Sequence, residues 1–225
     1  MTVAIINETS AADRNEDILK ALDGRGHRLI NCGMRRNGEE PQLSYIQTGF
    51  LSALLLNLQR VDFVVGGCGT GQGFLNAVVL YPNVVCGHIV TPLDAWLFTR
   101  INGGNCVSLM LNQGYGWGSD VNLRLIFDHL FGDARGEGFP EHRKSAQQHS
   151  AALLAKLSLG THRTMAQIVA EIPDEVAVPV FTYPGVKDLV LDGQFADREL
   201  GRSLESRISA ASAGADLRAA TEERK

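Results

Sequence analysis

The sequence predicts an α/β fold, a three-layer αβα sandwich with a five-stranded parallel sheet and a C-terminal extension. Five short apolar segments of strand length alternate with helical patterns, which is typical of βα units. The strands are apolar almost throughout, as expected of parallel strands that helices cover on both faces. A glycine-rich segment joins the third strand to the helix after it, at the edge of such sheets where ligands collect.

The strand–helix units occupy the first 131 residues, enough for a complete, small Rossmann-like domain. The expected strands are residues 3–6, 27–31, 61–66, 84–90 and 106–111. The expected helices are residues 16–22, a helix that Pro41 opens and that continues to Leu58, a helix that begins near Phe74, and residues 92–101 and 121–131. Pro92 suits a first helical turn.

The composition changes after residue 131. We expect a loop over residues 132–140. Helical patterns follow at residues 141–157, 161–171 and 197–208. Residues 175–191, with their valines and prolines, are interpreted as short strands or an irregular arm, and residues 209–225 as a frayed end or an exposed helix. We expect one domain over residues 1–150 and an extension over residues 151–225 that serves as a dimer-wrapping arm or a lid.

Composition and charge exclude several classes of function. The 225 residues carry a net charge of −4, so we expect no nucleic-acid partner and no anionic membrane partner. No apolar run approaches the roughly 18 residues of a membrane span, and the N-terminus lacks the basic start of a signal peptide. The four cysteines show neither CxxC nor zinc-like spacing, which predicts reduced thiols, a cytoplasmic location and no metal site.

The segment from Gly66 to Gly73, GGCGTGQG, is the most informative part of the chain. Its five glycines let backbone N–H groups approach a ligand closely and favour an anionic one. It is neither a Walker A loop nor a GxGxxG dinucleotide loop. Cys68 lies among these N–H donors, where a thiol can act as a base or a nucleophile. The alternative interpretation is a small buried cysteine in a tight turn.

The chain from residue 61 to residue 109 resembles the ribose-5-phosphate isomerase B / galactose-6-phosphate isomerase family. The residues that carry the resemblance are Cys68-Gly69-Thr70-Gly71-Gln72-Gly73, Pro92 before a helix, and Asn102 and Asn105. The resemblance covers roughly the first 150 residues. It implies a homodimer with two shared active sites, no cofactor, and aldose–ketose isomerisation of a small sugar phosphate through an enediol.

The resemblance also implies roles for individual residues. Cys68 would be the base that moves a proton between adjacent sugar carbons, and Thr70 would assist proton transfer or sugar binding. The backbone amides of Gly69, Gly71 and Gly73 would stabilise the enediolate oxygen. Glu8 takes the place of the family's first catalytic carboxylate. The substrate-binding residues would be Asn102, which contacts the sugar, and Arg143 and Lys144, which hold an anion.

The chain departs from the family pattern at three positions. Thr9 and Ile101 stand where the family has histidines, the second of which opens the sugar ring, and Pro140 stands at an arginine position. Either the substrate needs no ring opening, or another histidine, His142 or His88, supplies that function. A binding protein that has lost isomerase chemistry and a hydrolase with a nucleophilic Cys68 are the alternatives. The sequence therefore predicts a sugar-phosphate isomerase with these alternatives open.

Overall fold

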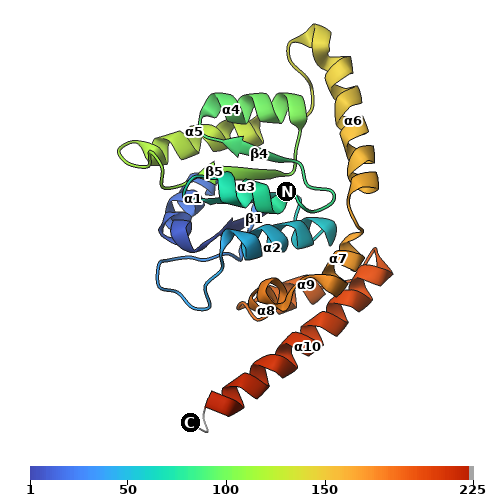
Figure 1. The fold of residues 1–225 in the computed structure, drawn as a ribbon. Helices are drawn as coiled ribbons and strands as arrows, with labels where there is room; N and C mark the ends of the chain where they lie inside the picture. The colour runs from blue at the N-terminus through green and yellow to red at the C-terminus, as the bar shows by residue number, and fades with distance from the viewer. Residues whose placement is uncertain (223–225) are drawn as a thin grey trace.

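The computed structural model describes the backbone of residues 1–222 and the side chains of residues 1–211. Its five strands form one parallel sheet in the order β2-β1-β3-β5-β4 (Figure 1). The strands are β1 (Thr2–Asn7), β2 (Arg28–Asn31), β3 (Phe63–Cys68), β4 (Cys86–Ile89) and β5 (Cys106–Met110). The predicted fold class is confirmed, and β3 lies at the centre of the sheet.

Helices cover both faces of this sheet. One face carries α1 (Asn15–Leu22), α4 (Pro92–Leu97) and α5 (Ser119–Gly132), and the other carries α2 (Tyr45–Asn57) and α3 (Gln72–Val78). Alternate strand residues point to opposite faces of the sheet. Ile5 and Val65 pack against α1, α4 and α5, whereas Ile6 and Val64 pack against α2 and α3. All strands point the same way, so their carboxyl ends meet at one edge.

Two expectations about local structure are wrong. Pro41 does not open the second helix: α2 begins at Tyr45, because Ser44 and Gln47 form a capping box around its first turn. Residues 175–191 form neither strands nor an irregular arm but two helices, α8 (Asp174–Phe181) and α9 (Val186–Leu191). Their valines suggest strands, but packing on other helices decides the outcome, as tertiary contacts override propensity.

The extension divides into an exposed helix and a packed group. α6 (Lys144–Thr161) has no buried residue, and it stands away from the sandwich in Figure 1. By contrast α7 (Met165–Glu171), α8, α9 and α10 (Arg198–Glu222) share a hydrophobic cluster with α2. The Phe181 ring lies 6.0 Å from that of Phe50, and the Tyr183 hydroxyl donates to the Gly33 carbonyl at 3.1 Å. These helices therefore continue the core of their own chain.

Two predictions about the extension stay open. Residues 209–222 belong to helix α10, and residues 223–225 lie outside the described residues, so the predicted exposure of this end stays a prediction. A dimer-wrapping arm or a lid stays a prediction. Within residues 1–222, no helix combines the length and hydropathy needed to cross a membrane, and the cytoplasmic location also stays a prediction.

Replacing Phe181 by alanine is expected to destabilise the whole chain. The ring is buried against α2, so its removal leaves a cavity at the junction of the extension and the sandwich. We expect a loss of about 3–5 kcal/mol in the free energy of unfolding, in one transition, measured by urea denaturation. The control, Leu93→Ala at an exposed position of α4, should change stability by less than about 0.5 kcal/mol. A small loss at Phe181 would contradict the shared core.

Candidate active site

Cys68 is the last residue of the central strand, at the edge where the carboxyl ends of the strands meet. Its carbonyl accepts hydrogen bonds from the N–H groups of Gly71 at 3.2 Å and Leu111 at 3.1 Å, which fixes the backbone on both sides. The residue is 6% exposed. The structure thus places the thiol where the sequence predicts a ligand site.

The other two buried thiols, Cys32 and Cys106, belong to the same hydrophobic core cluster as Cys68. Burial raises the pKa of Cys32 to about 12. Burial, together with the neighbouring Cys86 thiol, also raises the pKa of Cys106 well above its usual range. These two cysteines are held in the protonated, unreactive form, and their surroundings are those of structural residues.

Glu8 reaches the glycine loop through a serine that the sequence analysis did not identify. The Glu8 carboxylate is buried, and it accepts from the backbone N–H of Ser10 at 3.0 Å and from the Ser10 hydroxyl. The Ser10 oxygen in turn accepts from the N–H of Gly69 at 3.2 Å. Glu8 caps the 3-10 helix Thr9–Arg14, and this local contact gives no sign in the sequence of the link from Ser10 to a loop 59 residues away.

Only part of the predicted set of amide donors is free. The N–H of Gly69 is bonded to Ser10, that of Gly71 to the Cys68 carbonyl, and that of Gln72 to Thr70 Oγ1 at 3.3 Å. Within the part of the chain that the structure describes, the N–H groups of Thr70 and Gly73 have no acceptor. These two amides are the donors that a substrate oxyanion can use.

An arginine that the sequence analysis missed lies beside this edge. Arg14 donates from Nε to the Leu111 carbonyl at 3.1 Å, and its guanidinium lies 4.3 Å from the centre of the Tyr115 ring. The segment after β5 is bonded to the loop, since the N–H groups of Asn112 and Gln113 donate to the Gly69 carbonyl at 3.0 and 2.9 Å. Among the described residues, Arg14 has no carboxylate partner.

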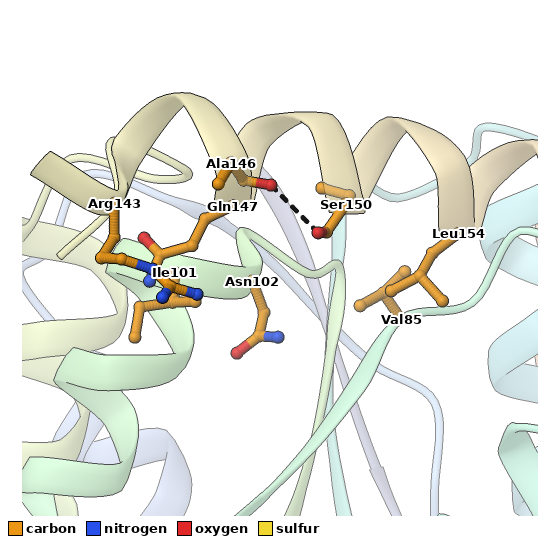
Figure 2. Close-up of a pocket in the computed structure, with 9 residues that line it drawn as sticks. Val85, Ile101, Asn102, Arg143, Ala146, Gln147, Ser150 and Leu154 are labelled. Carbon is orange, nitrogen blue, oxygen red and sulfur yellow. Dashed lines mark hydrogen bonds between the residues drawn. The ribbon is translucent and has the colours of Figure 1, made fainter.

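A second group of candidate residues lines a pocket of about 140 Å³ beneath α6. Figure 2 shows Gln147 in the first turn of α6 and Arg143 directly before that helix, facing Ile101 and Asn102 on the π-helical turn Phe98–Asn102. Val85 and Leu154 close the apolar end. The pocket therefore combines one cation and one amide with an apolar wall.

Lys144 does not line this pocket. Its ammonium forms an ion pair with Glu137, which raises the pKa of Lys144 and lowers that of Glu137. Arg143 has no carboxylate partner within the described residues and is the better anion ligand of the two. Its neighbour His142 is exposed and does not line the pocket either.

The predicted site residues therefore fall into two groups. Glu8, Cys68 and the loop to Gly73 lie together at the sheet edge, whereas Asn102 and Arg143 lie together beneath α6. None of residues 66–73 lines the pocket beneath α6. Within residues 1–211, histidine, cysteine, aspartate and glutamate side chains form no cluster of three or more that could hold a metal ion.

The chain matches the family model described as Ribose/Galactose Isomerase over residues 3–126. Two solved structures are similar over almost the whole chain. One is a 4-deoxy-L-threo-5-hexosulose-uronate ketol-isomerase complexed with a tartrate, with 36% identity, a TM-score of 0.86, and coverage of 93% of this chain and 100% of that one. The other is a ribose-5-phosphate isomerase from Vibrio parahaemolyticus, with 34% identity, a TM-score of 0.86, and coverage of 92% and 99%.

Other solved structures match a smaller part of the chain. A ribose 5-phosphate isomerase from Thermotoga maritima has 21% identity and a TM-score of 0.53, and the match covers 66% of this chain and 97% of that one. The two longer matches cover 92–93% of the chain and therefore include most of its C-terminal helices. No curated protein gives a significant match to the chain.

Proposed function

Because the chain belongs to the ribose/galactose isomerase family and is a sugar isomerase, we propose that it interconverts an aldose and a ketose with Cys68 as the base. The observation that carries this proposal is the position of the Cys68 thiol at the carboxyl edge of the central strand, beside two amides without acceptors. Proton abstraction next to a carbonyl needs such a pairing of a base with oxyanion donors.

In the proposed reaction the Cys68 thiolate takes the proton from the carbon beside the carbonyl. The electron pair of that C–H bond forms the enediolate double bond, and the carbonyl oxygen becomes an oxyanion held by the N–H groups of Thr70 and Gly73. The thiol then returns the proton to the former carbonyl carbon, while a hydroxyl proton moves between the two oxygens with the help of Thr70. Glu8 contributes through Ser10, whose hydroxyl holds the Gly69 amide.

We propose a substrate that reaches the enzyme with an open chain. The supporting observation is Ile101, a side chain without acid–base chemistry, at the position where the resemblance expects the ring-opening histidine. The compound named for the 36% identical relative fits this requirement. A sugar closes a five- or six-membered ring onto its C1 aldehyde through a hydroxyl at C4 or C5. A 4-deoxy-5-hexosulose has no oxygen at C4 and a ketone at C5, so it lacks both hydroxyls.

A panel of substrates tests this proposal. We expect turnover of 4-deoxy-L-threo-5-hexosulose-uronate and of short open-chain sugar phosphates, and a kcat/KM for ribose 5-phosphate at least about 100-fold lower, on the scale of one lost acid–base group. Equal turnover of ribose 5-phosphate would show that another group opens the ring. Ligand-dependent melting without turnover of any compound would favour a binding protein.

The second half of the proposed site comes from a second copy of the chain. Four leucines of α6 are exposed (Leu153, Leu154, Leu157 and Leu159). The first three are at i, i+1 and i+4 and therefore lie on one apolar stripe of the helix. They are about half exposed, so covering each contributes about half of the roughly 1.5–3 kcal/mol that full burial is worth. We propose a homodimer in which this face is covered, and in which Asn102 and Arg143 of one subunit complete the Cys68 site of the other.

Arg14 is expected to bind the acidic end of the substrate. Its terminal nitrogens have no carboxylate partner, and Arg–anion hydrogen bonds are strong, so Arg14→Ala should raise KM about 10- to 100-fold with little change in kcat. Steady-state kinetics on charged and neutral sugars of equal length measure this, with Arg124→Ala on α5 as the control. An equal rise in KM for the neutral sugar would contradict a role in binding charge.

A further inference from the structure

We propose that His88 and Ser108 are positioning residues that hold the two peptide groups after Thr70 in their catalytic orientation. The inference rests on the proposed function, since the loop that they hold contains the proposed base. Neither residue is needed to contact the substrate. Their effect is on the direction of the backbone amides around Cys68.

The two side chains lie next to each other beneath the loop. His88 on β4 and Ser108 on β5 are register partners in adjacent parallel strands, so both point to the same face of the sheet. His88 Nε2 lies 3.0 Å from the carbonyl oxygen of Thr70, and the buried Ser108 hydroxyl donates to the carbonyl of Gly71 at 2.5 Å. Two successive loop carbonyls therefore each accept a hydrogen bond from a side chain of a neighbouring strand.

The tautomer of His88 follows from these partners. A carbonyl oxygen only accepts, so Nε2 carries the proton that it donates to Thr70. The other ring nitrogen, Nδ1, faces the side-chain amide of Gln72 at 3.5 Å and acts as the acceptor. Because the Nε2 proton is committed to the loop backbone, we assign His88 to positioning and not to the ring-opening function considered from the sequence.

Holding a carbonyl also directs the amide on the other side of the same peptide plane. In a trans peptide the C=O and N–H point in opposite directions. Fixing the Thr70 carbonyl on β4 turns the Gly71 N–H to the Cys68 carbonyl, and fixing the Gly71 carbonyl on β5 turns the Gln72 N–H to Thr70 Oγ1. The two side chains thus fix the backbone that directly follows Thr70, the residue whose N–H has no acceptor among the described residues.

The glycine at position 71 agrees with this close fit. Its φ is +76°, and a Cβ atom there would lie 2.5 Å from His88 Nε2. No side chain fits between the loop and the histidine without displacing one of them. The absence of a side chain at Gly71 therefore allows the His88 ring to approach the loop backbone and donate to it.

The test compares His88→Leu with His88→Gln. Leucine removes the donor, whereas the glutamine amide can place an N–H close to the position of Nε2. For His88→Leu we expect kcat to fall about 10- to 100-fold, the scale of a misplaced catalytic group, with KM nearly unchanged. His88→Gln should keep kcat within about threefold. Ser108→Ala, a second variant in case leucine impairs folding, should lower kcat in the same way.

Amide hydrogen exchange at Gly71 supplies a readout independent of activity. We expect exchange about tenfold faster or more in His88→Leu, with exchange in β1 unchanged, and near-native exchange in His88→Gln. The inference is overturned if His88→Leu keeps wild-type kcat and exchange, or if glutamine is as harmful as leucine. If the wild-type protein turns over no sugar, the proposed function fails, and the exchange rates alone decide whether the two residues hold the loop.

Discussion

Replacing Cys68 by serine is expected to lower kcat by about 10²–10⁴-fold, the usual contribution of a positioned general base. A serine hydroxyl is a far weaker acid than a thiol, so almost no alkoxide is present to take the proton. The fold should persist, because the side chains have similar shapes and both backbone bonds to the Cys68 carbonyl remain. Steady-state kinetics and thermal melting measure the two effects.

Cys86→Ser is the matched control for this variant. Cys86 is a free thiol like Cys68 but only half-buried, and it lies at the start of β4, away from the carboxyl edge of the sheet. Its replacement should leave kcat within about threefold of wild type, as expected of a side chain outside the site. Full turnover by Cys68→Ser, or equal losses in both variants, would show that Cys68 is not the base.

Mixing two inactive variants is expected to restore activity. Cys68→Ser damages the loop half of the site, and Arg143→Ala damages the half beneath α6. In a random one-to-one mixture half of the dimers are mixed, and each mixed dimer has one site with both halves intact, so about a quarter of wild-type activity should return. The measurement is the activity of the mixture after co-expression with two different affinity tags, and the mixed dimer purified through both tags should have about half of the wild-type activity, because one of its two sites is intact.

The control pairs two variants of the same half, Cys68→Ser and Glu8→Gln. No mixed dimer of these contains an intact site, so activity should stay at the sum of the parents. If the mixture of Cys68→Ser and Arg143→Ala is also no more active than its two parents together, the site is not shared between subunits.

The sheet could be predicted from the sequence because its signals are local. Each strand is a short apolar run, and burial alternates between two cores along it, as Val64 and Val65 show. The start of α2 at Tyr45 was missed because the capping of Ser44 by Gln47 outweighs the preference of proline for a first turn. Helices α8 and α9 were missed because their valines favour strands in isolation, and contact with α2 reverses that preference.

The candidate site could be predicted only in part from the sequence. Cys68 and Glu8 could be found because Cys68 ends one strand and Glu8 directly follows another, and strands of a parallel sheet end at one edge. The contacts of Ser10 and Arg14 could not, since they join residues 59 and 97 positions apart. The ring of His88 was recognisable as a candidate, but its partner, the Thr70 carbonyl, is visible only once β4 lies beside β5 beneath the loop.

Deuterium uptake from solvent tests the central claim most directly. Wild type and Cys68→Ser would each be incubated in deuterated water with 4-deoxy-L-threo-5-hexosulose-uronate, and proton NMR would follow the former aldehyde carbon in the product. We expect the wild-type enzyme to form product that carries deuterium at this carbon, and the serine variant to do so about 10²–10⁴-fold more slowly. Product formation without any deuterium uptake would contradict transfer through a solvent-exchangeable thiol, and exchange by the serine variant at the wild-type rate would contradict Cys68 as the base.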